Sequence, residues 1–329
     1  MRQCVAATTL KILWNVIAVP QMSDPDLLPV DAATATTDAE WLAVMDRIGD
    51  EAGYFQPLGG HHHALFLDDT PTLVVTFETL ADIRARPGQL PLGFGIAKAK
   101  GWSHLCVIAD GDTWWRDPAV YRYFDRLVDD AFFEDFDRVL FYGADMAGYA
   151  ACAYSVTAPG ATVLAINPRA TLAPALAGWD KRASTARRMD FTSRYGYAPD
   201  MTEGTGKVFV IHDPTVTEDA MHAALFNAPW VTHLHTPHLG GRVAWALGHM
   251  KLLPRLIEAG VEGRLTPDIF AKAWRARRQF GPYLKAVLAA VDKPAHPARA
   301  KAVCKSVAAR LNAPMFRKRL AELERAGDQ

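Results

Sequence analysis

The chain has 329 residues, of which half are apolar, 22% are charged and 10% are aromatic. This composition excludes an intrinsically disordered chain and is sufficient for one large hydrophobic core or a core domain with a helical appendage. The formal net charge is zero, but residues 251–329 hold 17 Lys and Arg against 7 Asp and Glu, so the rest of the chain is acidic. Because the basic segment carries no recognised nucleic-acid motif, we expect no nucleic-acid partner.

Residues 1–37 are predicted to form an arm and linker ahead of the folded part. Cys4–Pro20 is rather apolar, but Lys11 and Asn15 interrupt it and no clean cleavage site follows. The segment is also too short and too polar to span a membrane. The four cysteines of the chain show no CxxC spacing, which suits a reducing compartment. We therefore expect a cytoplasmic protein without a membrane span.

Short apolar strands alternate with helical stretches from residue 38 onward, in a domain expected to cover residues 38–250. The expected helices are Asp38–Glu51 behind an Asp38 cap, Asp117–Phe133 with Pro118 in its first turn, and Ala147–Val156. The expected strands are His63–Leu67, Thr72–Phe77, Leu105–Ala109, Val139–Tyr142, Thr162–Ile166, Val208–His212 and Trp230–His235. This alternation predicts an α/β fold, a mostly parallel sheet with helices on both faces, in which Thr72–Phe77, Leu105–Ala109, Val139–Tyr142, Thr162–Ile166 and Val208–His212 are parallel neighbours.

Two segments are predicted to lie outside this alternation. Residues 168–207 are rich in Arg and aromatic residues and are placed between two strands, where a lid over a site is expected. Arg188, Arg194 and Tyr195 there suit an anionic or sugar-like ligand, by bidentate hydrogen bonds and stacking; alternatively, the aromatic residues anchor a surface excursion. Residues 251–329 are predicted to form a basic helical extension with its Lys and Arg in water.

The segment Arg138–Tyr154 reads RVLFYGADMAGYAACAY. It contains G-x-D-x-G between a buried strand and a helix, one residue away from the nucleophile elbow G-x-S-x-G. In such a turn the flanking positions must be small, and the central residue, here Asp145, lies at a helix N-terminus that favours an anion. Asp145 is therefore a candidate nucleophile; an Asp that only caps the helix is the alternative.

On these residues and the following TVLAINPRATL, the chain resembles α/β-hydrolases with an elbow of the type YGxSMGGYAA. VTFE, GDTWWRD, YGADMAGYAA, PGATV, FTSRYGYAPDM and DAMHAALF also resemble an uncharacterised group of alphaproteobacterial proteins, over about residues 40–260. Its members are often named phosphoadenosine phosphosulfate reductase, but Cys304 lies in AVCKSV and lacks that enzyme's ECG-H-like motif. Haloalkane dehalogenases and epoxide hydrolases resemble this chain in having an elbow aspartate, although Met146 and Val75–Leu80 depart from their usual residues.

The resemblance implies the chain order nucleophile, acid, histidine. The acid is expected to be Asp213 or Asp219, either of which could instead cap a helix. The histidine is expected to be His238, which precedes two glycines, rather than His233 or His235 on the last strand.

An oxyanion hole would use the N–H of Met146 and one near Glu78 or Thr79. Glu78 either points into the cleft as a substrate-binding group or pairs with Arg84 or Arg116. We expect no metal and no cofactor.

Two functions remain open at this level. The first is a hydrolase of an ester-type or related substrate, with a small-molecule or glycan-like ligand. The second is an inactive hydrolase-like binding or accessory protein, with surface-polysaccharide export as one such role. The two share a fold, which does not by itself determine function, and the oligomeric state is left open.

Overall fold

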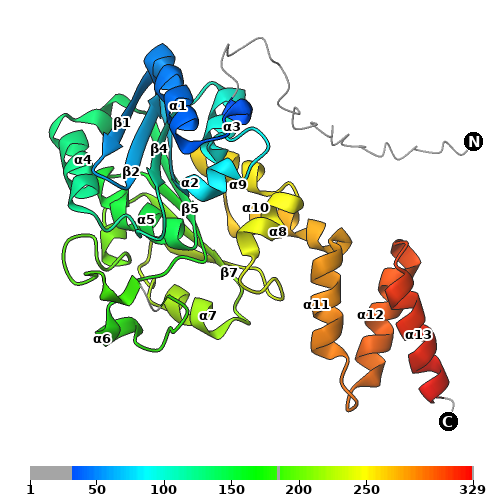
Figure 1. Ribbon diagram of the computed structural model, residues 1–329. Coiled ribbons are helices and arrows are strands. Elements are labelled where there is room, and N and C mark those ends of the chain that lie inside the picture. The colour runs from blue at the N-terminus through cyan, green and yellow to red at the C-terminus, as the bar shows by residue number, and fades with distance from the viewer. Residues whose placement is uncertain (1–31, 184–185, 328–329) are drawn as a thin grey trace, which may run out of the picture.

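The computed structural model describes residues 32–183 and 186–327 (Figure 1). A twisted sheet with helices on both faces forms the body, and three C-terminal helices lie beside it. The predictions for residues 1–31, including Cys4–Pro20, lie outside the described residues. Within the described part, no helix is both long and apolar enough to cross a membrane.

Within the described residues, eight strands form one sheet in the order β1-β2-β4-β3-β5-β6-β7-β8. β2 pairs antiparallel with both of its neighbours, and every other strand pair after it is parallel. The strands are β1 (Gly53–Leu58), β2 (His62–Leu67), β3 (Thr72–Thr79), β4 (Ser103–Ala109), β5 (Arg138–Ala144), β6 (Thr162–Ile166), β7 (Lys207–His212) and β8 (Val231–His235). The predicted parallel neighbours, now β3 to β7, are confirmed. β1 was not predicted, because its sequence GYFQPL mixes polar residues and proline with its apolar ones.

Helices cover both faces of the sheet. The α-helices are α1 (Asp38–Ala52), α2 (Leu80–Arg84), α3 (Leu92–Lys100), α4 (Pro118–Asp129), α5 (Met146–Tyr154), α6 (Pro174–Ala177), α7 (Thr217–Ala224), α8 (Val243–His249), α9 (Leu253–Val261), α10 (Pro267–Ala273), α11 (Gly281–Val291), α12 (Pro297–Arg310) and α13 (Pro314–Gly327). Short 3₁₀ turns are η1 (Ala32–Thr34), η2 (Phe132–Asp135), η3 (Ser155–Thr157), η4 (Ala186–Arg188), η5 (Asp200–Thr202) and η6 (Trp274–Gln279).

The alternation of side chains along the strands separates the core into layers. In β3, Val75 and Phe77 face the cluster formed with α4 and α5, whereas Val74 faces the cluster formed with α8 to α10. Cys106 of β4 faces a third cluster with α1. Because both faces are covered, every residue of β4 is buried, as parallel strands in an α/β fold require.

The helix starts follow local capping chemistry. α4 begins at Pro118 behind Asp117, whose side chain accepts a hydrogen bond from the Ala119 N–H at 2.7 Å. The prediction that Asp38 caps the first helix is wrong: Thr37 is the cap. Its side chain accepts from the Glu40 N–H, and the Glu40 carboxylate accepts from the Thr37 N–H, which completes a capping box.

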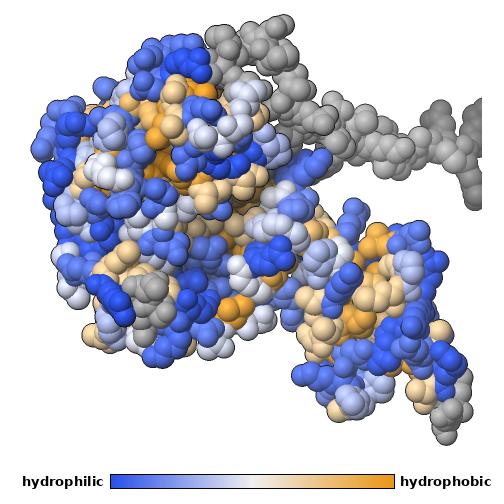
Figure 2. Space-filling model, viewed as in Figure 1, coloured by the Kyte–Doolittle hydropathy of each residue, from blue (hydrophilic) through white to orange (hydrophobic). Residues whose placement is uncertain are grey.

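The predicted helical extension divides into two parts. α9 and α10 bury Leu253, Ile257 and Phe270 against the sheet. α11 to α13 have a small core of their own, composed of Leu284, Leu288, Ala300, Cys304, Val307 and Phe316. Figure 2 shows apolar surface in the middle of this helical unit and hydrophilic surface around it.

Candidate active site

The turn after β5 lies at the edge of the sheet where the parallel strands end. Asp145 has φ 53° and ψ −114°, a conformation that non-glycine residues rarely adopt. The glycines on either side allow it: a Cβ on Gly143 would lie 2.0 Å from the Ala147 carbonyl oxygen, and one on Gly148 would lie 3.0 Å from that of Ile166. The chain therefore passes from strand to helix with Asp145 held in a strained backbone conformation.

The side chain of Asp145 is not used as a helix cap. Asp145 occupies the N-cap position of α5, but its carboxylate makes no capping hydrogen bond. Its backbone is fixed instead, since the N–H donates to the Ile166 carbonyl at 2.8 Å and the carbonyl accepts from the Tyr149 N–H at 3.1 Å. The alternative in which Asp145 serves as a side-chain cap is thus wrong.

The environment of Asp145 makes its carboxyl group more basic than usual. The residue keeps solvent-exposed surface, yet nearby protein atoms desolvate the carboxyl and raise its pKa to about 6. The positive charge of Arg169 opposes this rise, and the negative charge of Asp219 adds to it. The group is therefore mostly ionised at neutral pH and a stronger base than an ordinary aspartate.

A network of ion pairs built on two buried aspartates lies next to Asp145. The Asp219 carboxylate accepts from Arg182 at 2.6 Å and from Arg169 at 3.2 Å. The Asp180 carboxylate accepts from Arg182 at 2.8 Å and contacts His222 Nε2 at 3.1 Å. Burial, together with the charge of Arg169, lowers the pKa of His222 to about 4. The network fixes the start of the segment 168–207 against α7.

The Asp219 carboxylate therefore forms ion pairs with two arginines. It lies at the third position of α7 and is almost fully buried, so the alternative in which it caps that helix is wrong. No hydrogen bond joins it to a histidine among the described residues.

Asp213 holds the loop that follows β8. Its buried carboxylate accepts from the Thr215 N–H at 2.8 Å, from the Thr215 hydroxyl at 2.7 Å and from the Gly240 N–H at 2.6 Å. Gly240 lies two residues after His238, so this acid positions the histidine loop through its backbone.

His238 has a positive φ of 67° and a partly exposed ring that lies 6.4 Å from that of Tyr283, centroid to centroid. In the part of the chain that the structure describes, it makes no hydrogen bond to Asp145, Asp213 or Asp219. His233 instead donates to the Phe226 carbonyl at 2.9 Å, and His235 lies exposed at the end of β8.

The residues expected near the oxyanion are placed by local structure. The Met146 N–H is the first of α5, a position without an intrahelical acceptor. The Thr79 side chain accepts from the Asp82 N–H at 3.1 Å and caps α2. Glu78 is buried and pairs with Arg86 at 2.5 Å, so the expected partners Arg84 and Arg116 are wrong.

The segment 168–207 is anchored to the body by its second half. Arg194 pairs with Asp125 of α4, and the Tyr195 carbonyl accepts from the Tyr149 hydroxyl at 2.5 Å. Arg188 is exposed in η4. The first half approaches Asp145 through Arg169 and Arg182. Arg182 belongs to the arginines expected in the lid, whereas Arg169 was not predicted; it was detectable because it follows a strand end, where parallel sheets place their sites.

No protein-family model matches the chain, and no curated protein matches it. A Glycosylation Associate Protein (Gap123) complex from Streptococcus agalactiae is similar in structure, with a TM-score of 0.43 and 15% identity over 61% of this chain and 44% of that one, less than half its length. Est1E from Butyrivibrio proteoclasticus has a TM-score of 0.43 and 14% identity over 64% of this chain and 97% of that one. The capsule O-acetyltransferase of Neisseria meningitidis serogroup A has a TM-score of 0.40 and 12% identity over 62% of this chain and 95% of that one.

These TM-scores are all below 0.5. The fold is assigned from the chain's own topology. A nucleophile position on a strained turn between a central parallel strand and a helix, followed along the chain by acid and histidine positions after later strands, defines the α/β-hydrolase arrangement. Asp145 directly follows β5, Asp213 directly follows β7, and the loop that carries His238 follows β8. The chain therefore has an α/β-hydrolase-like fold with additional C-terminal helices.

Proposed function

We propose that the protein is a hydrolase of an ester-type or related small-molecule or glycan-like substrate, in which Asp145 replaces the usual serine. The observation that carries this proposal is the strained backbone of Asp145 together with a carboxylate that makes no hydrogen bond in the described structure. A non-glycine residue in such a conformation costs on the order of 1–3 kcal/mol. A residue that only ended a strand would not need this strain.

The chemistry follows from a carboxylate nucleophile. One oxygen of Asp145 attacks an electrophilic carbon of the substrate, and the bond to the leaving group breaks. Attack on an alkyl carbon leaves an ester to Asp145, and attack on an acyl carbon leaves a mixed anhydride. The leaving group takes its proton from water. A second water, deprotonated by His238, then attacks the carbonyl carbon of the Asp145 ester or anhydride; the bound part of the substrate leaves as the alcohol or acid with the proton from His238, and the Asp145 carboxylate is regenerated. The raised pKa of about 6 leaves the nucleophile ionised at pH 7 but still basic.

The neighbouring groups have supporting roles in this proposal. The N–H of Met146 and one near Thr79 stabilise the oxyanion that forms when water attacks the ester. Arg169 favours the ionised form of Asp145. His238 must rotate toward Asp145, which its partly exposed ring permits; catalytic hydrogen bonds often tighten only when substrate is bound.

The test uses two variants and two probes, p-nitrophenyl acetate for acyl transfer and 1,2-epoxyhexane for attack on an alkyl carbon. Asp145→Asn is expected to lose turnover and keep its circular dichroism spectrum, because an amide is isosteric but a poor nucleophile. With 1,2-epoxyhexane, His238→Gln is expected to accumulate the Asp145 ester, seen by intact-protein mass spectrometry as the added mass of the epoxide. His249→Gln, on an exposed residue of α8, serves as the control and should behave as the wild type.

A second candidate function is an inactive hydrolase-like binding or accessory protein, with surface-polysaccharide export as one such role. The observation that favours it is the lack of any hydrogen bond between His238 and the three aspartates among the described residues. It predicts no turnover of either probe by the wild type and no added mass in His238→Gln, a result that would contradict the first proposal.

A further inference from the structure

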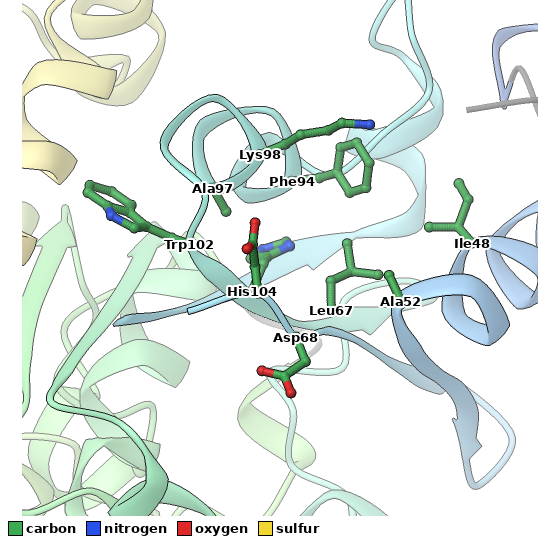
Figure 3. Close-up of a pocket in the computed structure, with 10 residues that line it drawn as sticks. Ile48, Ala52, Leu67, Asp68, Phe94, Ala97, Lys98, Trp102 and His104 are labelled. Carbon is green, nitrogen blue, oxygen red and sulfur yellow. The ribbon is translucent and has the colours of Figure 1, made fainter. Parts of the chain in front are cut away.

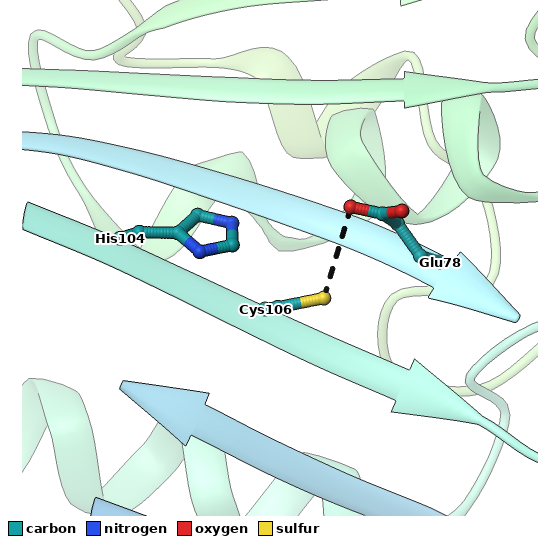
Figure 4. Close-up of side chains that lie close together, drawn as sticks. All are labelled: Glu78, His104 and Cys106. Atoms are coloured by element: carbon teal, nitrogen blue, oxygen red, sulfur yellow. Dashed lines mark hydrogen bonds between the residues drawn. The ribbon is translucent and has the colours of Figure 1, made fainter. Parts of the chain in front are cut away.

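Three side chains with metal-ligating atoms lie together between β3 and β4. Glu78 projects from β3, and His104 and Cys106 project from β4 on the same face of the sheet (Figure 4). All three are buried, and one ligand atom from each lies within 4.8 Å of the other two. The Cys106 sulfur is 3.9 Å from Glu78 Oε1.

The donor set and spacing suit a Zn²⁺ ion. Sulfur, imidazole nitrogen and carboxylate oxygen are the ligands that zinc prefers, at about 2.0–2.3 Å in tetrahedral geometry. Such bond lengths place neighbouring donor atoms roughly 3.3–3.8 Å apart. The observed separations therefore require only small side-chain shifts to enclose an ion.

The two oxygens of Glu78 have different surroundings. Oε2 accepts from Arg86 at 2.5 Å and from the Leu92 N–H at 2.9 Å. Oε1 has only longer contacts, to the Thr76 hydroxyl at 3.2 Å, the Gly93 N–H at 3.3 Å and the Cys106 thiol. A ligating carboxylate is commonly held in this way, by outer partners on one oxygen while the other faces the metal.

Space above the cluster depends on a glycine. A Cβ on Gly93 would lie 2.2 Å from His104 Nε2 and 2.7 Å from a methyl carbon of Thr76. His104 Nε2 contacts the Thr76 hydroxyl at 2.9 Å, and that hydroxyl also reaches Glu78 Oε1, so Nε2 is the nitrogen on the carboxylate side. Gly93 must therefore remain without a side chain if His104 Nε2 and Glu78 Oε1 are to keep their positions.

One member of the cluster lies beside a cavity. His104 lines a partly open cavity of about 150 Å³ with Asp68 and Asp69 of the β2–β3 connection, Phe94 and Lys98 of α3, and Trp102 (Figure 3). The buried His104 Nδ1 has no hydrogen-bond partner. A water in the cavity could accept from Nδ1–H once Nε2 ligates a metal, the outer contact that zinc-bound histidines usually make.

We propose that Glu78, His104 and Cys106 form a zinc site within the sheet, with the Thr76 hydroxyl or a water as the fourth ligand. On binding, the Cys106 thiol loses its proton to solvent and the sulfur bonds to Zn²⁺. Arg86 acts as a positioning residue, since it touches only the outer oxygen of Glu78. The site stabilises the β3–β4 pair.

The experiment measures metal content and cobalt spectra of the full chain. Wild-type protein purified without chelator is expected to contain about one zinc per chain by elemental analysis. After chelation, titration with Co²⁺ is expected to give the near-ultraviolet absorption band of a cobalt thiolate. Cys106→Ser should lose the band, whereas Cys152→Ser, which changes a cysteine equally buried in α5, should keep it.

Gly93→Ala separates ligand loss from loss of space, because it retains all three ligands. It is expected to weaken Co²⁺ binding at least tenfold. The matched control is Gly88→Ala, at an exposed glycine with no neighbour within 4 Å, and it should have no effect on Co²⁺ binding. A folded wild type that takes up neither metal in stoichiometric amount, or a cobalt band that survives in Cys106→Ser, overturns the proposal and leaves the cluster as a hydrogen-bonded part of the core.

Discussion

The Asp213 carboxylate accepts a hydrogen bond from the Gly240 N–H at 2.6 Å, and so joins the end of β7 to the loop that carries His238. The acid that a hydrolase would use to orient its histidine side chain here orients the histidine backbone. The other carboxylate oxygen of Asp213 accepts two hydrogen bonds from Thr215. The position of His238 therefore depends on one buried carboxylate.

Replacement of this carboxylate should loosen the loop. Asp213→Ala leaves the N–H groups of Thr215 and Gly240 without their side-chain acceptor, and we expect the free energy of unfolding to fall by about 1–3 kcal/mol. Urea unfolding measures the loss, and amide exchange at Gly240 should accelerate. Asp112→Ala, on an exposed loop aspartate, is the control; an equal effect there would contradict the role of Asp213.

Asp145 should make stability depend on pH. Its folded pKa of about 6 exceeds the ordinary aspartate value of about 3.9, so the folded state holds the proton more tightly than the unfolded state. The free energy of unfolding contributed by this group is highest below about pH 4 and falls as pH rises to about 6.

Asp145→Asn removes this titration. We expect the variant to be more stable than the wild type at pH 7, by about 1 kcal/mol after allowance for solvent screening of an exposed residue, and equally stable near pH 4. Thermal unfolding of both proteins across pH 4–8 tests this. A stability difference that does not change with pH would show that the pKa of Asp145 is not raised in the folded protein.

Asp145→Ser tests whether the rest of a serine-hydrolase site is present. The strained turn would present a serine hydroxyl beside the Met146 N–H, and we expect covalent labelling by a fluorophosphonate probe if His238 reaches it. Labelling is read on a gel, with Asp145→Ala as the unlabelled control. No labelling of the folded Ser variant, together with an inactive wild type, would favour the binding-protein alternative.

The ion pairs of the buried Asp180 should be far more sensitive to mutation than a surface pair. Asp180→Asn leaves Arg182 and Arg169 with one fewer buried negative charge, and we expect a loss of about 3–5 kcal/mol in the free energy of unfolding. Asp125→Asn breaks the exposed pair with Arg194 and should cost at most about 1 kcal/mol. Comparable losses in the two variants, measured by urea unfolding, would contradict this assignment.

Local sequence was sufficient to predict strands β2 to β8 and the turn at Asp145. The apolar runs at Thr72–Phe77 and Val208–His212 need cover on both faces, which predicts buried parallel strands whatever lies around them. The glycines at 143 and 148 predict a tight passage from strand to helix, because no side chain fits there. Mixed segments such as Gly53–Leu58 carry no such periodic signal, and that strand was missed.

Only the tertiary structure decided which charged groups meet. Asp219 could have been a cap or a catalytic acid by sequence, and its partners Arg169 and Arg182 come from the segment before β7. Glu78 pairs with Arg86 and not with Arg84, two residues earlier, because the turn of the chain after α2 directs one guanidinium inward and the other toward the Thr37 carbonyl. Backbone conformation and apolar burial are encoded locally, whereas the pairing of polar side chains depends on distances between segments that only the packed fold brings together.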